Sequence, residues 1–142
     1  MRIINRKVKR DYKIVEPFEA GVVLTGAEVK AVRAKRANLT GSYAKFVEGE
    51  LYLVNVKINA QGVRESQTTR SRKLLLHKNE LVSLASKVKQ KRLTIVPIAL
   101  YTKGRLVKAE LALAQSKKRF EKKDAKKQKD IEREVARELK LA

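Results

Sequence analysis

Apolar and polar residues alternate along much of the chain, and this pattern predicts a protein built mainly of β-strands. The strand-like runs are residues 11–24, 42–47, 51–58, 93–101 and 106–114. Residues 48–50 and 102–105 contain glycine and each join two of these runs, which indicates hairpin turns. In the run 51–58 we expect one alternating set to face the core, namely Tyr52, Val54, Val56 and Ile58.

Two stretches have the pattern of short helices. Thr25 and Glu28 match a capping box, so a helix should begin there and continue to Arg33. Between residues 78 and 89, Leu81, Leu84, Ala85 and Val88 have the spacing of one helix face, which predicts a second helix.

The order of these elements predicts the fold class and the domain organisation. Pro17, Gly21 and Pro97 interrupt strand-like runs and should mark strand edges or bulges, and residues 59–72 form a polar loop. Short hairpin strands with inserted helices are typical of a small antiparallel barrel or sandwich. We therefore expect a mobile basic arm at residues 1–10, a barrel domain at 11–114 and a basic tail at 115–142.

Composition makes a polyanion the expected partner. The formal net charge is +20, and most of it lies before residue 115, so the folded body is itself basic. Cysteine is absent, which excludes disulfides and thiolate metal sites. No apolar run is long enough to span a membrane, and the N-terminus lacks the apolar stretch of a secretory signal. We expect a cytoplasmic protein.

The last stretch, residues 117–141, is basic and poor in core-forming side chains. Phe120, Ile131, Val135 and Leu139 fall on one stripe of a helix, but the stripe is too sparse to dock firmly on a core. The stretch is therefore either a solvated C-terminal helix or a segment that folds against an anionic partner, and the charge of the body favours the second. Phe120, outside any core, suits stacking on a base.

Catalytic chemistry has little support in the sequence. His77 is the single histidine and precedes a predicted helix, where a surface or capping role is favoured over that of a base. The glycines are isolated, so there is no phosphate-binding loop, and the carboxylates of the body show no metal-ligand spacing. We expect no enzyme activity, no cofactor and no metal.

Nucleic-acid binding is better supported, because basic side chains release condensed counterions from phosphate backbones. Without a helix-turn-helix or zinc-finger signature, RNA or single strands fit better than duplex DNA. The candidate contacts in the body are Arg6, Lys7, Lys30, Arg33, Arg70, Arg72, Lys73, His77 and Lys78. Strand aromatics can stack on bases, but their spacing favours the core; they are Tyr12, Phe18, Tyr43, Phe46, Tyr52 and Tyr101.

Several blocks of sequence, in one order, resemble the bacterial SsrA-binding protein (small protein B) family. They are FEAGVVLTGAEVKAVRAKRANLTGSYA, RSRKLLLHKNEL, LTIVPIALYTKGRLVKAEL and KKRFEKKDAKKQKDIERE, and the match runs from residue 5 to about residue 137. The resemblance implies an oligonucleotide-binding-like antiparallel β-barrel with small helices and a basic C-terminal tail that becomes helical when bound.

The resemblance also implies a function and partners. The family binds the tRNA-like domain of transfer-messenger RNA and delivers it to stalled ribosomes for trans-translation, with the tail in the decoding centre and the empty mRNA channel. The partners expected are therefore transfer-messenger RNA, the small-subunit RNA of the ribosome and, through the RNA, elongation factor Tu.

Carried over by position, the family's RNA contacts fall on Asn5, Glu19, Leu75 and Lys108. Its aromatic-acidic-basic-basic tail motif falls on Phe120, Glu121, Lys122 and Lys123. The further tail residues expected at the decoding centre are Lys117, Lys118, Arg119, Lys126, Lys127, Arg133 and Arg137.

The sequence departs from the family pattern at three places. Ser116 stands where the family usually has a glycine, Lys123 stands where it often has an arginine, and residues 67–69 replace a common His-Asp-Pro. A lysine lacks the bidentate fork of arginine, so the departures bear on the tail and on the long loop. Two alternatives of other classes are a ribosomal or RNA-chaperone protein with a basic tail, and a metal-dependent nuclease.

Overall fold

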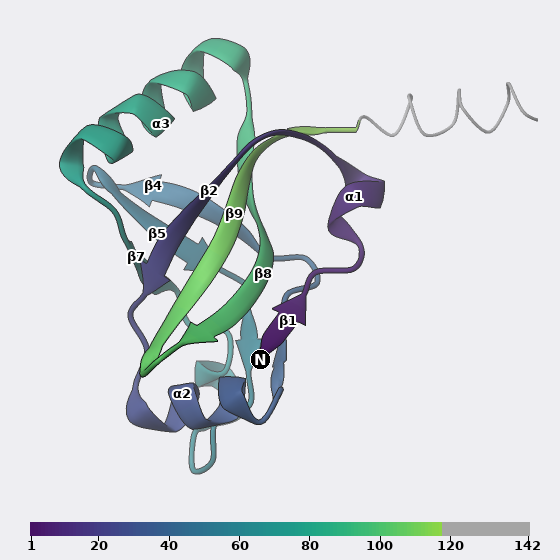
Figure 1. The fold of residues 1–142 in the computed structure, drawn as a ribbon, viewed down its shortest axis with the longest axis vertical. Helices are drawn as coiled ribbons and strands as arrows, with labels where there is room; N and C mark the ends of the chain where they lie inside the picture. The colour runs from purple at the N-terminus through teal and green to yellow at the C-terminus, as the bar shows by residue number, and fades with distance from the viewer. Residues whose placement is uncertain (118–142) are drawn as a thin grey trace, which may run out of the picture.

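A computed structural model describes residues 1–117 and shows a β-barrel with three short α-helices in that range (Figure 1). The strands are β1 (Arg2–Ile4), β2 (Tyr12–Val22), β3 (Ala37–Asn38), β4 (Tyr43–Val47), β5 (Glu50–Val54), β6 (Lys57–Ile58), β7 (Arg72–Leu75), β8 (Thr94–Lys103) and β9 (Leu106–Ser116). The helices are α1 (Val8–Asp11), α2 (Gly26–Arg33) and α3 (Lys78–Lys91), with a 3₁₀ turn, η1, at Glu65–Gln67.

The main sheet is antiparallel and closes on itself. Its strand order is β1-β8-β4-β5-β7-β2-β9, and β9 also pairs with β8, which completes the barrel. β3 and β6 form a separate two-stranded sheet. Figure 1 shows α3 at one end of the barrel and α2 at the other. Of the barrel and the sandwich that the sequence pattern allowed, the structure is the barrel, and it fits the oligonucleotide-binding-like fold that the family resemblance implied.

Buried aliphatic side chains fill the barrel. Leu51, Leu74, Leu100, Leu111 and Leu113 are at most 1% exposed and belong to one core cluster. A second, smaller cluster of Val8, Val96 and Ala114 packs under α1, flanked by Tyr12, Ile14 and Tyr43. Burial of aliphatic side chains on this scale is the main source of stability in a domain of this size.

The N-terminal residues are not a mobile arm, contrary to the prediction. β1 pairs with β8 in the register Arg2↔Tyr101 and Ile4↔Ala99, and α1 follows directly. Val8 is buried in the second core cluster and anchors α1. The alternating apolar residues of this segment, which were interpreted as part of a basic arm, pair with a sheet edge instead.

The predicted core face of residues 51–58 is correct for only part of the run. Val54, Val56 and Ile58 are buried as predicted, but Leu51 and Leu53 are buried as well. The core cluster contains Leu51, Leu53, Val56 and Ile58, so its members change from odd to even positions along the run. Asn55 lies between them with a φ of 64°, a left-handed conformation that interrupts the strand. Tyr52 consequently faces away from the core clusters and is half-buried.

Local signals in the sequence are confirmed at the helices. The Thr25 hydroxyl accepts from the Glu28 N–H at 3.2 Å, and the Glu28 carboxylate accepts from the Thr25 N–H at 3.0 Å, which completes the capping box of α2. His77 is exposed at the N-cap position of α3, where its N–H donates to Glu80 at 3.3 Å. No helix within residues 1–117 is long and apolar enough to cross a membrane.

The expected strand irregularities are found at two of the three predicted positions. The β8–β9 register shifts between Pro97 and Ala99, so a bulge accommodates Pro97 as predicted. Pro17 pairs only with Ala112 of β9, because the β2–β7 pairing is limited to Gly21 and Val22, so it lies at an edge as predicted. Gly21 pairs with strands on both sides, and the register shift of β2 lies instead between Ile14 and Glu16.

Candidate nucleic-acid interface

One row of residues crosses the outer face of the barrel from β1 to β7. In the registers of successive strand pairs, Arg2 lies opposite Tyr101, Tyr101 opposite Lys108, Lys108 opposite Gly21 and Gly21 opposite Leu75. Residues opposite one another in a sheet point to the same side, and Arg2 and Leu75 are exposed, so this is the solvent side. Residues from distant parts of the chain thus form one continuous surface.

Two carboxylates lie directly opposite each other in the next row. Glu19 of β2 faces Glu110 of β9, an arrangement of like charges that disfavours strand pairing unless it is compensated. The Lys108 ammonium lies 2.9 Å from the Glu19 carboxylate, and Arg2 donates to the Glu110 carboxylate. Each carboxylate is therefore matched by one cation on the same face.

Tyr101 and Lys108 hold Glu19 in its ionised form. The Tyr101 hydroxyl and then the Lys108 ammonium, both hydrogen-bonded to Glu19, hold the pKa of its carboxyl below the ordinary value. Burial and the Glu19 carboxylate raise the pKa of the Tyr101 hydroxyl to about 12. The Arg2 guanidinium lies 5.8 Å from the centre of the Tyr101 ring, within cation–π range. The carboxylate is therefore an oriented acceptor at neutral pH.

A cleft of about 360 Å³ lies on this face beside the β2–β7 pairing. Its lining includes Glu19, Leu75, His77 and Lys108, which the sequence analysis had assigned separately to RNA contact. Gly21 also lines the cleft, next to the Leu75 side chain. Leu75 is 54% exposed, so it is not a core residue and offers an apolar surface to a ligand.

The cleft combines three kinds of contact that suit RNA. Glu19 can accept hydrogen bonds of the kind that base amino groups and ribose hydroxyls donate, Lys108 can attract a phosphate, and Leu75 offers an apolar surface on which a base or sugar can pack. Among residues 1–117 there is no group of three or more His, Asp or Glu side chains able to hold a metal ion.

Two of the predicted contact residues are buried and fully engaged inside the protein. The Arg72 guanidinium is 0% exposed and donates to the Glu28 carboxylate and to the carbonyls of Val56, Thr68 and Arg70. The prediction of a phosphate contact for Arg72 is therefore corrected to an internal ion pair.

Asn5 is the second buried residue. It is 7% exposed, and its side-chain amide donates to the carbonyls of Leu39 at 3.3 Å and Pro97 at 3.0 Å. These bonds fasten the end of β1 to the barrel, which gives Asn5 a structural role in the described fold.

The remaining predicted contacts lie in several places. Lys73 is exposed beside Leu75 on β7, and Lys78 is exposed at the start of α3, so both lie near the cleft.

The other predicted contacts lie away from the cleft. Arg70 is half-buried and donates to Glu28. Arg6 and Lys7 are exposed between β1 and α1. Lys30 and Arg33 lie on α2, and Arg33 donates to the Gly104 carbonyl at 3.2 Å.

Sequence reasoning did not assign Arg2, Tyr101 and Glu110 to this face. Tyr101 was considered for stacking, but its strand spacing favoured the core; Phe18, Phe46, Tyr12 and Tyr43 do pack against the core clusters. Tyr101 differs from these four aromatic residues in its strand register, which places it opposite Arg2 and Lys108. That register cannot be read from a single sequence.

Of the predicted tail residues only Lys117 is described, and Lys118 to Arg137 lie outside the described residues.

Lys117 is held against α1 at the end of β9. Its N–H donates to the Asp11 carbonyl at 3.0 Å, and its side-chain ammonium donates to the Lys9 carbonyl at 3.3 Å. β9 pairs with β2 as far as Ser116, which lies opposite Tyr12. The serine that replaces the usual glycine of the family is thus part of a regular strand.

The fold and the outer face together define a small oligonucleotide-binding-like barrel with an RNA-type contact surface. The SmpB protein family model matches residues 2–141, and this chain belongs to that family.

Relatives from several bacteria are similar over most of their length. The SsrA-binding protein of Dehalococcoides mccartyi is 43% identical over 139 residues, covering 96% of this chain and 81% of the relative. That of Sulfurovum sp. is 46% identical over 141 residues, covering 96% and 92%. A solved structure, described as "tmRNA-SmpB: a journey to the center of the bacterial ribosome", has a TM-score of 0.68 and 45% identity, covering 83% of this chain and 85% of that one.

Proposed function

We propose that this protein binds the tRNA-like domain of transfer-messenger RNA and delivers it to stalled ribosomes for trans-translation. The observation that carries the proposal is the cleft where Glu19, Leu75 and Lys108 meet, because three of the four contact positions carried over from the family converge there from separate strands, with His77 beside them. The family membership and the ribosome-bound structural relative support it. In this proposal the protein binds RNA and catalyses no reaction. Because the ribosomes that it serves are in the cytoplasm, the protein is cytoplasmic.

The outer face and the tail have separate tasks in this proposal. Lys108, Glu19 and Leu75 hold the RNA, with Lys73, His77 and Lys78 beside them on β7 and α3. The tail, which continues from Lys117, enters the decoding centre and the empty mRNA channel of the small subunit. Elongation factor Tu, reached through the RNA, stays a prediction.

Fluorescence anisotropy with the tRNA-like domain of transfer-messenger RNA tests the RNA contact. If about 6 to 10 phosphates are contacted, affinity falls about a thousandfold or more between 50 and 200 mM salt. Glu19→Ala and Leu75→Ala should each weaken binding with little change in the melting temperature, because these side chains lie outside the core. Lys108→Ala should also weaken binding, with a small loss of stability, because Glu19 then faces Glu110 without its own cation. Lys89→Ala, which removes an exposed charge on α3, is the matched control.

The same measurement separates this function from a general ribosomal or RNA-chaperone role. A protein of that kind would bind an unrelated RNA of equal length as tightly as the tRNA-like domain, and its Lys108→Ala and Lys89→Ala variants would behave alike. Either result contradicts the proposal.

A further inference from the structure

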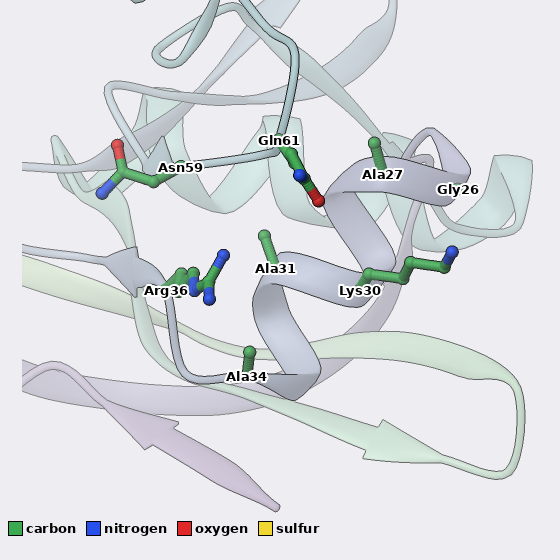
Figure 2. A pocket seen from close by; sticks show the side chains of 8 residues that line it. All are labelled: Gly26, Ala27, Lys30, Ala31, Ala34, Arg36, Asn59 and Gln61. Atoms are coloured by element: carbon green, nitrogen blue, oxygen red, sulfur yellow. The ribbon is translucent and has the colours of Figure 1, made fainter.

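A second and larger cleft, of about 610 Å³, lies between α2 and the segment that follows β6 (Figure 2). It is lined by Gly26, Ala27, Lys30, Ala31, Ala34, Arg36, Asn59 and Gln61. None of these residues lines the cleft on the outer face, so the two sites are separate. Its volume is in the range of small-molecule and nucleotide pockets.

Backbone hydrogen bonds hold the two walls of this cleft in place. The Asn59 N–H donates to the Arg36 carbonyl at 2.9 Å, and the Arg36 N–H donates to the Ala31 carbonyl at 2.8 Å. Pairing of Ala37 with Ile58 joins β3 to β6 directly behind them. The opening is therefore preformed, and a ligand entering it does not have to order the backbone first.

The charge of the cleft is entirely positive. Lys30 and Arg36 are exposed and have no ion-pair partner among residues 1–117, and no acidic residue lines the cleft. Arg70 and Arg72, by contrast, are matched by Glu28 on the buried side of α2. Cations without a protein partner in a preformed cleft favour an anionic ligand.

The other lining groups indicate what kind of anion fits. Besides Gly26 and Lys30, the side of the cleft formed by α2 and its C-cap consists of Ala27, Ala31 and Ala34, whose small side chains leave room for a flat ring against the helix. Figure 2 shows the Gln61 side chain pointing from its loop toward α2 and the Arg36 guanidinium pointing toward Ala31, whereas the Lys30 and Asn59 side chains point away from them on opposite sides. An amide beside an apolar surface can pair with the edge of a base, and with adenine it forms two hydrogen bonds, donating to N7 and accepting from N6.

We infer that this α2 cleft binds one unstacked nucleotide of RNA, with adenine preferred, so that the protein contacts RNA at two separate sites. The base lies on Ala27 and Ala31, the Gln61 amide pairs with its edge, and Arg36 contacts its phosphate. This inference rests on the proposed function in one respect, which is that the protein's partner is RNA. An acidic peptide would pair with Lys30 and Arg36 but would not require the alanine surface or the Gln61 amide.

The first test is a titration of the isotope-labelled full-length protein with AMP, UMP, CMP, GMP and ribose 5-phosphate, followed by NMR. AMP should shift the signals of Ala27, Ala31 and the Gln61 amide more than the other nucleotides do. Equal shifts with ribose 5-phosphate would mean an anion site without base recognition. A polyglutamate peptide that saturates the same signals as tightly as AMP would mean an acidic protein partner. Either result overturns the inference.

The second test compares variants for binding to the tRNA-like domain of transfer-messenger RNA. Gln61→Ala carries no charge change and should weaken binding about 3- to 10-fold, the loss of one or two hydrogen bonds, with the salt dependence unchanged. Arg36→Gln should lower the slope of log affinity against log salt by about 1. Both side chains are exposed, so the fold should persist. Lys89→Gln is the charge-matched control.

The pattern across variants separates this inference from the proposed function. If Lys108→Ala weakens binding but Gln61→Ala does not and Arg36→Gln behaves like Lys89→Gln, the α2 cleft is not an RNA site and the outer face still is. If the α2 variants weaken binding and Lys108→Ala does not, the inference stands and the assignment of the outer face is wrong.

Discussion

The Arg72 Nε lies 2.7 Å from the Glu28 carboxylate, and this buried ion pair joins β7 to the first turn of α2. Glu28 also accepts from the Thr25 N–H and from Arg70, so one carboxylate completes the helix cap and balances two guanidiniums. Burial by itself would raise the pKa of Glu28, but the Thr25 N–H, Arg70 and Arg72 outweigh it and hold that pKa below its ordinary value. The pair fixes α2 against the barrel.

Breaking this pair should destabilise the fold. Glu28→Gln keeps an acceptor for the Thr25 N–H but leaves the Arg72 charge buried without a counter-ion, which should cost about 3 kcal/mol or more. Urea unfolding measures the loss, and adding Arg72→Met to Glu28→Gln should restore part of it. A Glu28→Gln variant as stable as the wild type would show that the pair contributes nothing.

The same carboxylate makes stability depend on pH in the acid range. Because the pKa of Glu28 is lower in the folded than in the unfolded protein, its contribution is complete above the ordinary value of 4.5 and is lost as the pH falls below it. Urea unfolding from pH 7 to pH 3 should show a smaller decline for Glu28→Gln than for the wild type. Parallel curves would contradict this assignment.

Asn5→Ala should lower the stability of the fold rather than remove a direct contact with RNA. The substitution removes the side-chain donor to the Pro97 carbonyl and one of the donors to the Leu39 carbonyl, which Ser42 still bonds; this costs about 1 to 3 kcal/mol. The free energy of unfolding from urea titration measures this. If stability is unchanged and RNA binding is weakened, Asn5 contacts RNA directly, as the family resemblance implied.

Tyr101 should ionise at unusually high pH. Its pKa of about 12 means that the folded protein favours the protonated hydroxyl, so this stabilisation is complete below pH 10 and is lost as the pH rises toward 12. NMR titration of labelled tyrosine rings resolves Tyr101 from the other three tyrosines. Glu19→Gln should lower the pKa of Tyr101 only in part, because burial is the larger cause; a return to 10 would contradict this order.

Removal of the tail should separate RNA binding from ribosome rescue. A chain that ends at Lys117 keeps every residue that the structure describes, including both clefts, so its melting temperature and its affinity for the tRNA-like domain should change only modestly. Rescue of stalled ribosomes in a reconstituted translation assay should fail, because all the expected decoding-centre contacts except Lys117 are removed. Phe120→Ala in the full chain should impair rescue more than any single Lys→Ala, since a stacking contact contributes about 1 to 3 kcal/mol.

Equal loss of RNA binding and of rescue in the truncated chain would place the tail in the RNA-binding surface. The division of tasks between the outer face and the tail would then be wrong, although the fold would be unaffected.

The sequence by itself determined the features that depend on neighbouring residues. The capping box of Thr25 and Glu28, the α3 helix and the glycine-containing hairpin turns were predicted correctly, because each is stabilised by groups a few residues apart. The basic character of the body also follows from composition alone. The resemblance to a family supplied Glu19, Leu75 and Lys108 as candidate contacts, but not their arrangement.

Only the tertiary structure decided which side chains are free and which of them meet. Arg70 and Arg72 look alike in the sequence as exposed loop cations, yet the partner that engages them, Glu28, lies more than forty residues away in sequence. Lys108 and Glu19 meet because β9 pairs with β2 in one register, and the inward phase of β5 and β6 depends on a left-handed Asn55. Long-range register and burial are set by the closure of the whole barrel, and local sequence patterns do not encode them.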